Sequence, residues 1–236
     1  NIAVKPTGGA NPLITGNNSI AIGTDVVADK SQQTIIGFSV SNAMQNSVQI
    51  GPGNSVGYNN ASAYGHSVII GASNSVMTKD VPYQRMVVIG ESNAVNEGNG
   101  PAIVIGYSNT VDNQKGFAAP QIAIGKSNSV YGTNGIAIGN YAYAKNSANG
   151  YAGNAIGYFA TAYGDGAFAI GRFTYAKDEH SIAIGTNANA YQTRSLAIGY
   201  NSTAYREKAI AIGESSEANE NYAVALGFSA EANSTG

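Results

Sequence analysis

The sequence predicts an all-β fold, a parallel β-roll (solenoid) of about 14 rungs, instead of a globular domain around one core. The first observation is a short motif of two aliphatic residues flanking a small one, followed by glycine. From residue 155 it reads Ala-Ile-Gly every 14 residues and ends as Ala-Leu-Gly at 225–227. A fixed period with a fixed signature is typical of solenoids, in which each repeat stacks on its neighbour. The second observation is composition: 11% of the residues are charged, against about a quarter in ordinary globular proteins.

The glycines that close this motif, here called the anchor glycines, define the rungs. They are Gly23, Gly37, Gly51, Gly71, Gly90, Gly106, Gly125, Gly139, Gly157, Gly171, Gly185, Gly199, Gly213 and Gly227. Eight of the 13 intervals between them are 14 residues long, and the other five are longer. The longer intervals predict extended loops within 51–125 and 139–157. We therefore expect an N-terminal cap segment at 1–16 and the repeats at 17–236.

Each rung is expected to begin with a short strand just before its anchor glycine. Isoleucine precedes 13 of the anchors and Leu226 the last, an aliphatic residue usually stands three before, and alanine lies between them at nine. Such alternation puts the large side chains on one face of a strand, and we expect that face to be the interior. The residues between them should then face outward and pack against another chain. This predicted interface consists of Ala21, Ile35, Ile69, Val88, Val104, Ala123, Ala137, Ala183, Ala197 and Ala211.

A second short strand is expected after each anchor. Small residues three and five positions later, such as Ala188 and Ala190, share one parity and should face the interior. The rungs anchored at 51–125 instead carry asparagine and then valine at these positions, as in Asn54 and Val56. This difference predicts a column of stacked asparagines.

These motifs resemble a known family. Asn18-Ser19-Ile20-Ala21-Ile22-Gly23 and the repeated Ile-Ala-Ile-Gly are similar to the head repeat of the trimeric autotransporter adhesins, the YadA-like head. The resemblance covers nearly the whole chain from about residue 17. It implies a left-handed parallel β-roll, assembled as an intertwined homotrimer, at the cell surface or outer membrane of a bacterium. The family's neck, stalk and membrane anchor have no counterpart in these residues, so it implies the extracellular head of a longer chain.

Few residues of the chain indicate catalysis or metal binding. The chain has two histidines, no cysteine and a net charge of −2 without a basic cluster, so we expect no catalytic residues, metal, cofactor or nucleic-acid partner. We also expect no membrane contact by this part of the chain, since no run approaches the length of a membrane span.

Two groups of residues are candidates for ligand binding. Loops on a rigid scaffold often carry binding residues, and the extended loops supply Tyr58, Tyr64, Tyr83, Arg85, Lys115 and Phe117. Four tyrosines lie six residues after an anchor: Tyr131, Tyr163, Tyr191 and Tyr205. Three more, Tyr107, Tyr158 and Tyr200, directly follow an anchor. Stacked on successive rungs, such tyrosines would form stripes suited to adaptable interfaces. For the extended loops the alternative is that they brace neighbouring chains of the trimer.

The leading functional hypothesis is a bacterial adhesin head that attaches to host matrix proteins, glycans or abiotic surfaces by multivalent, non-enzymatic binding. One alternative is a polysaccharide-processing β-solenoid enzyme, which would need a cluster of carboxylates on one face. Another is a structural spacer that displays a different domain.

Overall fold

The computed structural model describes residues 1–4, 10–42, 45–58, 65–78, 84–96, 100–112, 120–146 and 151–235. Every regular element in these ranges is a strand. The chain divides into two compact units, Asn1–Gln121 and Ile122–Gly236. We call them unit one and unit two.

The strands of unit one are β1 (Ile2–Val4), β2 (Leu13–Ile14), β3 (Ile20–Ala28), β4 (Thr34–Asn42), β5 (Ser47–Ile50), β6 (Ser55–Tyr58), β7 (Gly65–Ala72), β8 (Ser75–Thr78), β9 (Gln84–Glu91), β10 (Ala94–Asn96), β11 (Ala102–Tyr107) and β12 (Thr110–Asp112). Strands β3 and β4 pair in parallel along almost their whole length. From β5 onward each turn has two separate strands, because the odd-numbered strands pair with one another and the even-numbered strands do the same. The segment before residue 17 also contributes strands, since β1 and β2 pair with the two halves of β3.

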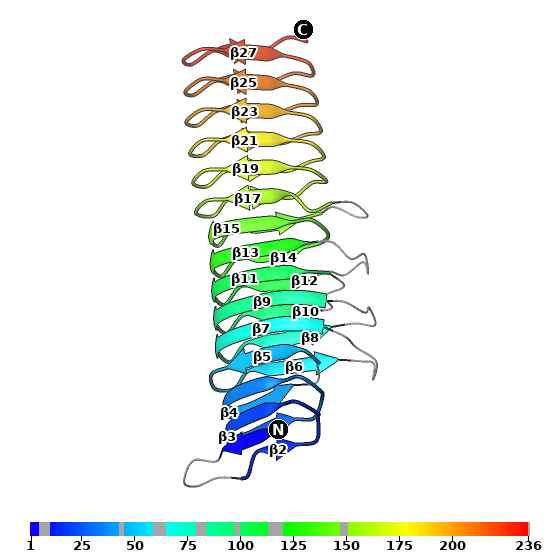
Figure 1. The fold of residues 1–236 in the computed structure, drawn as a ribbon. Coiled ribbons are helices and arrows are strands. Elements are labelled where there is room, and N and C mark those ends of the chain that lie inside the picture. Colours follow the sequence, from blue (N-terminus) through cyan, green and yellow to red (C-terminus); the bar gives the residue numbers. More distant parts are fainter. Residues whose placement is uncertain are drawn as a thin grey trace. The chain divides into compact units, whose positions relative to one another are not determined.

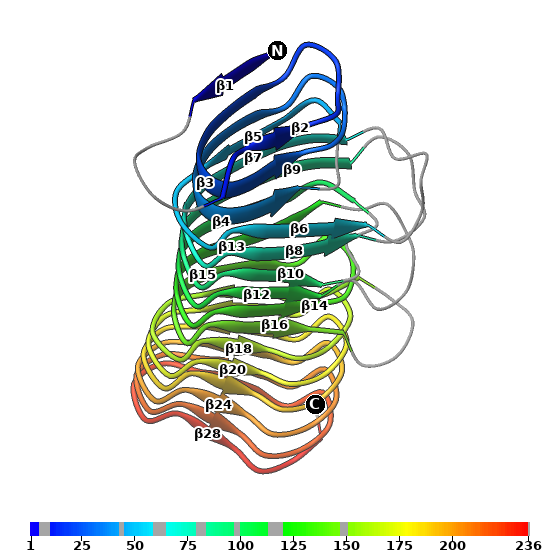
Figure 2. The same cartoon turned by 90° about the horizontal axis from the view of Figure 1, so that it is seen from below.

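The strands of unit two are β13 (Gln121–Lys126), β14 (Ser129–Tyr131), β15 (Ile136–Asn140), β16 (Tyr143–Lys145), β17 (Asn154–Ile156), β18 (Thr161–Ala162), β19 (Phe168–Ile170), β20 (Tyr175–Ala176), β21 (Ile182–Ile184), β22 (Asn189–Ala190), β23 (Leu196–Ile198), β24 (Thr203–Ala204), β25 (Ile210–Ile212), β26 (Glu217–Ala218), β27 (Val224–Leu226) and β28 (Glu231–Ala232). Each of them up to β26 pairs in parallel with the strand two further along the chain. Figure 1 labels the stacked odd-numbered strands β15 to β27, and Figure 2 labels even-numbered strands between β14 and β28.

The register of this pairing aligns equivalent residues of successive turns. In the pairing of β21 with β23, Ala183 lies beside Ala197 and Ile184 beside Ile198. A residue at a given distance from its anchor glycine therefore stands in a column with its equivalents in the same unit. The predicted all-β solenoid of about 14 turns is confirmed.

The direction predicted for the side chains of the odd-numbered strands is wrong. The residue between the two aliphatic ones points inward: Ala183 is 0% exposed, whereas its neighbour Ile182 is 37% exposed. The predicted chain interface is therefore the interior of the roll, and its residues cannot touch another chain. The ten residues of that predicted interface are each 0% exposed: Ala21, Ile35, Ile69, Val88, Val104, Ala123, Ala137, Ala183, Ala197 and Ala211.

The physical reason is the small space between the two sheets of a turn. In unit two the even-numbered strands also point small side chains inward, and Ala188 and Ala190 are fully buried, as predicted. Alanine methyl groups from both sheets fill this narrow interior, where pairs of isoleucines would be overpacked. In unit two the branched aliphatic side chains are therefore turned outward. In unit one the interior also holds branched residues, such as Ile69, Val76 and Val88.

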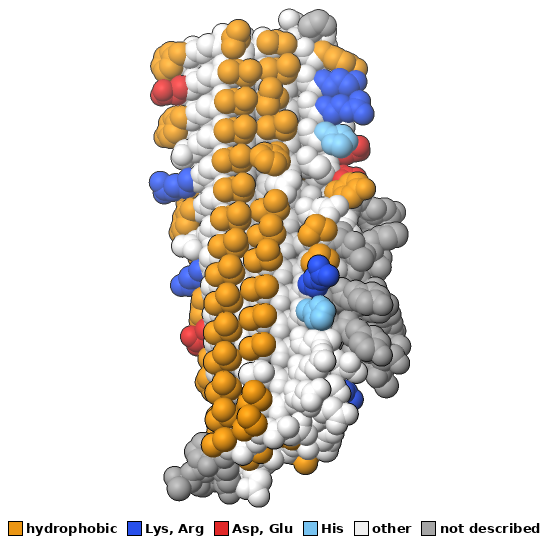
Figure 3. Space-filling view, in the orientation of Figure 1, with side chains coloured by type: hydrophobic (Ala, Val, Ile, Leu, Met, Phe, Trp, Pro, Cys, Tyr) orange, Lys and Arg blue, Asp and Glu red, His pale blue; other side chains and the backbone are white. Residues whose placement is uncertain are grey.

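These outward side chains form two neighbouring rows along the odd-numbered strands of each unit, visible in Figure 3. We call them the aliphatic columns; they consist of the residues one and three positions before each anchor glycine. Most are aliphatic and all are partly or fully exposed in the single chain. The most exposed are Ile36, Ile50, Ile70, Ile89, Ile103, Ile105, Ile182, Val224 and Leu226.

The predicted column of stacked asparagines is present in unit one. The side-chain amide of Asn93 donates to Asn74 Oδ1 at 3.0 Å, and the amide of Asn109 donates to Asn93 Oδ1 at 3.0 Å. Asn93 Nδ2 also donates to the carbonyl oxygen of Gly106, the anchor of the following turn, at 2.9 Å. These side chains are buried. The column therefore satisfies buried polar groups while tying each turn to the next.

Replacing one of these asparagines should destabilise the roll. Asn93→Leu removes the buried amide that donates to Asn74 Oδ1 and to the Gly106 carbonyl oxygen, and it removes the oxygen that accepts from Asn109. The free energy of unfolding should therefore fall by about 2–4 kcal/mol. Urea unfolding followed by circular dichroism measures this change. Asn17→Leu, at an exposed asparagine of the same unit, is the control and should change it by less than about 0.5 kcal/mol. Equal effects of the two substitutions would show that the column does not stabilise the fold.

Candidate ligand-binding surface

The even-numbered strands of unit two and the residues just after them carry one tyrosine on each of six consecutive turns. We call this series the tyrosine ladder; its rings make contact in two groups, Tyr131–Tyr163 and Tyr175–Tyr205. Ring-centroid distances are 5.7 Å for Tyr131–Tyr143 and 6.0 Å for Tyr143–Tyr163. They are 5.8 Å for Tyr175–Tyr191 and 5.6 Å for Tyr191–Tyr205. The ladder thus contains the four tyrosines predicted six residues after an anchor, together with Tyr143 and Tyr175.

Sequence reasoning missed Tyr143 and Tyr175 because they lie four residues after their anchors, not six. Both positions have the same outward parity on the strand, since the residues three and five after the anchor point inward. Parity was therefore the signal that could have found them. Tyr143 contacts Tyr131 and Tyr163, and Tyr175 contacts Tyr191, across this difference in position, because an aromatic side chain reaches diagonal neighbours.

In the two turns whose ladder tyrosine lies four residues after the anchor glycine, a lysine follows two residues later. Lys145 and Lys177 both lie six residues after an anchor. Lys145 Nζ donates to the hydroxyl oxygen of Tyr163 at 3.2 Å and lies 5.1 Å from the centre of that ring. This hydrogen bond is the main reason that the pKa of Lys145 is raised, whereas burial raises the pKa of Tyr143. At neutral pH this part of the ladder therefore presents a charged amine, that of Lys145, near the neutral phenol of Tyr143.

A hollow of about 550 Å³ lies at the C-terminal end of the ladder. It is lined by Lys177, Tyr191, Tyr205, Arg206, Glu217 and Asn219. The ladder ends here because the next position in its column is Asn219 and not a tyrosine. An aromatic surface, cations, a carboxylate and an amide therefore line one small concave site.

The tyrosines predicted directly after the anchors do not form a stripe of their own. Tyr107 lies in unit one, while Tyr158 and Tyr200 lie three turns apart in unit two. All three are exposed. Tyr158 instead contacts two phenylalanines, Phe159 at 4.7 Å and Phe173 at 5.4 Å between ring centroids.

These phenylalanines belong to a second aromatic group, the corner aromatics, which the sequence analysis did not find. Tyr141, Phe159 and Phe173 lie two residues after their anchors, with φ of 57°, 53° and 56°. In the other rungs the residue at this left-handed position is serine, asparagine, aspartate or glycine. These residues adopt a left-handed backbone conformation more readily than aromatic residues do. The rings stack at 4.8 Å and 5.7 Å, and each is at least 40% exposed. Bulky exposed residues in a left-handed conformation make this corner a second candidate contact surface.

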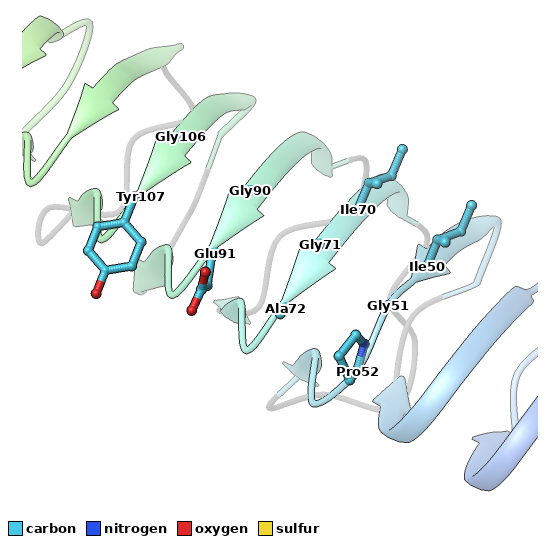
Figure 4. Close-up of a pocket in the computed structure, with 10 residues that line it drawn as sticks. All are labelled: Ile50, Gly51, Pro52, Ile70, Gly71, Ala72, Gly90, Glu91, Gly106 and Tyr107. Atoms are coloured by element: carbon cyan, nitrogen blue, oxygen red, sulfur yellow. The ribbon is translucent and has the colours of Figure 1, made fainter.

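Unit one has a shallow apolar groove at the corresponding corner (Figure 4). It has a volume of about 580 Å³ and follows the anchor glycines Gly51, Gly71, Gly90 and Gly106, which have no side chains to fill it. Ile50 and Ile70 of the aliphatic columns border it. The groove is therefore continuous with the apolar face of this unit.

Most of the predicted loop residues lie outside the described residues: Tyr64, Tyr83, Lys115 and Phe117. For Tyr58, at the end of β6, only the backbone is described. Arg85 lies in β9 and is exposed. Binding by these loops stays a prediction.

Within the described ranges, no three residues among histidine, cysteine, aspartate and glutamate are grouped so that they could hold a metal ion. The same ranges contain no helix long and apolar enough to cross a membrane.

The family model described as the YadA head domain repeat (2 copies) matches residues 15–25, 122–142, 148–174, 176–202 and 207–230. No curated protein matches the chain. The repeat match agrees with the stacked turns, and the matched repeats are those of the YadA-like head domain of the trimeric autotransporter adhesins. Adhesins of this family form homotrimers and are exposed outside the cell on outer-membrane autotransporters.

Proposed function

We propose that this head domain attaches a bacterium to host matrix protein, to host-surface glycan or to an abiotic surface, as a non-enzymatic, multivalent homotrimer. The match to an adhesin repeat supports the general role. The exposed aliphatic columns are the observation that supports assembly into a trimer. Monomeric soluble proteins rarely expose apolar patches larger than a few hundred Å², and here two rows follow each unit.

In this proposal the aliphatic columns of three chains face a common axis. The sequence alone predicted that the residues between them, mostly alanines, would form this interface. The two sheets of a turn point their outer faces in opposite directions, because both point their alanines toward each other. The tyrosine ladder, on the even-numbered strands, therefore faces away from the aliphatic columns of the same unit. Three copies of the ladder stay accessible, so weak contacts on each can add up through avidity.

The proposal extends to location: the trimer stands at the cell surface as the extracellular part of a longer, outer-membrane-anchored chain. The mild net charge of −2 and the absence of a basic cluster favour neither nucleic acid nor an anionic membrane surface as its partner.

Attachment can be tested with beads that carry the purified domain, applied to immobilised matrix proteins, to a glycan array and to host cells. We expect the trimer to bind at least one of these surfaces. Applied in solution without beads, a chain made monomeric by changes in the aliphatic columns should bind that surface about 100-fold more weakly than the trimer does, because avidity is lost. A folded trimer that binds none of the surfaces would instead support the spacer hypothesis.

A further inference from the structure

We propose that the hollow at the C-terminal end of the tyrosine ladder binds an acidic sugar, meaning a saccharide residue that carries a carboxylate. The residues named above line the hollow. They lie in or just after strands β20, β22, β24 and β26 of unit two. This inference rests on the proposed attachment function and specifies a ligand class for it.

The aromatic part of the site is one face of Tyr205. Its other face stacks on Tyr191, with the ring planes inclined by 16° and the centroids 5.6 Å apart. The following turn has Asn219 in the same column, and the smaller side chain leaves Tyr205 40% exposed. An open tyrosine face beside polar groups suits the C–H face of a sugar ring, which is apolar while its rim carries hydroxyls.

The charged part of the site favours an anion. Lys177 and Arg206 line the hollow and form no ion pair among the described residues. One carboxylate, Glu217, also lines it, and Asp178 directly follows Lys177 in the chain. The lining itself thus has two cations and one anion. A guanidinium can bind a carboxylate through two parallel hydrogen bonds, which assigns the ligand's acidic group to Arg206.

The remaining polar groups can bind hydroxyls. Asn219 Nδ2 already donates to Asn233 Oδ1 at 2.7 Å and to Glu231 Oε1 at 3.3 Å. Those bonds orient the amide and leave its oxygen to accept a hydrogen bond from a sugar hydroxyl. The carboxylate of Glu217 can accept another.

A saccharide fits this site better than an acidic peptide does. An extended peptide commonly binds by adding a strand to an open sheet edge, but β22, β24 and β26 are each paired on both sides. The lining of the hollow combines two tyrosines with four charged or amide side chains. It therefore suits one or two sugar rings with a negative charge.

The test uses biolayer interferometry of the trimeric domain at about 0.15 M salt with four immobilised probes. Two are acidic, 3′-sialyllactose and a hyaluronan tetrasaccharide; their neutral counterparts are lactose and chitotetraose. The site variants are Tyr205→Asn, which introduces the residue found at positions 219 and 233, and Arg206→Gln. The control variants are Tyr222→Asn, at an exposed tyrosine outside the ladder and the hollow, and Arg194→Gln, at an exposed arginine outside the hollow.

We expect at least one acidic probe to bind, and its neutral counterpart to bind about tenfold more weakly or not at all. Each site variant should weaken the acidic probe about tenfold, since the charge-assisted contacts or the ring face are lost. Each control should stay within about twofold of the wild type.

Three results would overturn the proposal: neither acidic probe binds, the neutral counterpart binds equally well, or the controls weaken binding as much as the site variants. Bead attachment to cells, measured in parallel, separates this proposal from the wider one. Attachment without acidic-sugar binding would refute the sugar site alone, whereas sugar binding without attachment would refute only the adhesive role.

Discussion

Gly185→Ala should lower the free energy of unfolding by about 3 kcal/mol or more, through backbone strain and overlap together. Gly185 has φ of +129°, a conformation that L side chains rarely adopt. An added Cβ would also overlap the carbonyl oxygen of Gly199, the anchor of the next turn, because the anchor glycines stack directly on one another. Differential scanning calorimetry should show a loss of roughly 6–12 °C in Tm for a chain of this size.

Gly227→Ala is the matched control for this prediction. Gly227 has a similar φ of +123°, but no heavy atom lies within 4 Å of the position that its Cβ would occupy. We expect this change to cost about 1 kcal/mol, from the backbone alone. If both variants lose the same small amount, then the close approach of successive turns does not constrain the anchor glycines.

The double variant Ile184→Glu/Ile198→Glu should dissociate the trimer. Both residues stand in the aliphatic columns and lie side by side in β21 and β23. Each isoleucine lost from an interface removes about 2 kcal/mol of apolar burial, so two per chain should raise the dissociation constant about 1,000-fold. The carboxylates would also repel their copies across the axis. Sedimentation velocity at micromolar concentration measures the change of mass.

A control for this experiment places the same charges on the opposite sheet. Thr161→Glu/Asn189→Glu alters two partly exposed positions whose equivalents in later turns are already Glu217 and Glu231. That variant should stay trimeric with an unchanged circular dichroism spectrum. Retention of the trimer by the isoleucine variant, or a wild-type monomer, would refute an interface along the aliphatic columns.

Much of the fold could be predicted because it depends on spacing along the chain. The recurrence of the anchor glycines every 14 residues indicated stacked turns, and the parallel register of strands such as β21 and β23 confirms them. The asparagine column followed from the same argument, since residues at equal distance from their anchors meet on successive turns. These features need only the period and the alternation of a strand.

The tyrosine ladder could be predicted in part, for the same reason. Tyr131, Tyr163, Tyr191 and Tyr205 share one spacing, but Tyr143 and Tyr175 join them from a different position on the strand. Their membership depends on how far a ring extends sideways between turns. The open end of the ladder at Tyr205 depends likewise on which side chains surround it in space.

The sequence by itself determined that the odd-numbered strands of unit two have an aliphatic face and a small-residue face, but only the tertiary structure decided which of them is inside. Strand alternation is symmetric: it separates Ile182 and Ile184 from Ala183 without saying which side meets the other sheet. The spacing of the two sheets within a turn decides it. That space holds the methyl groups of alanines from both strands and leaves Ile182 37% exposed, so the branched side chains that usually form a core here form a surface.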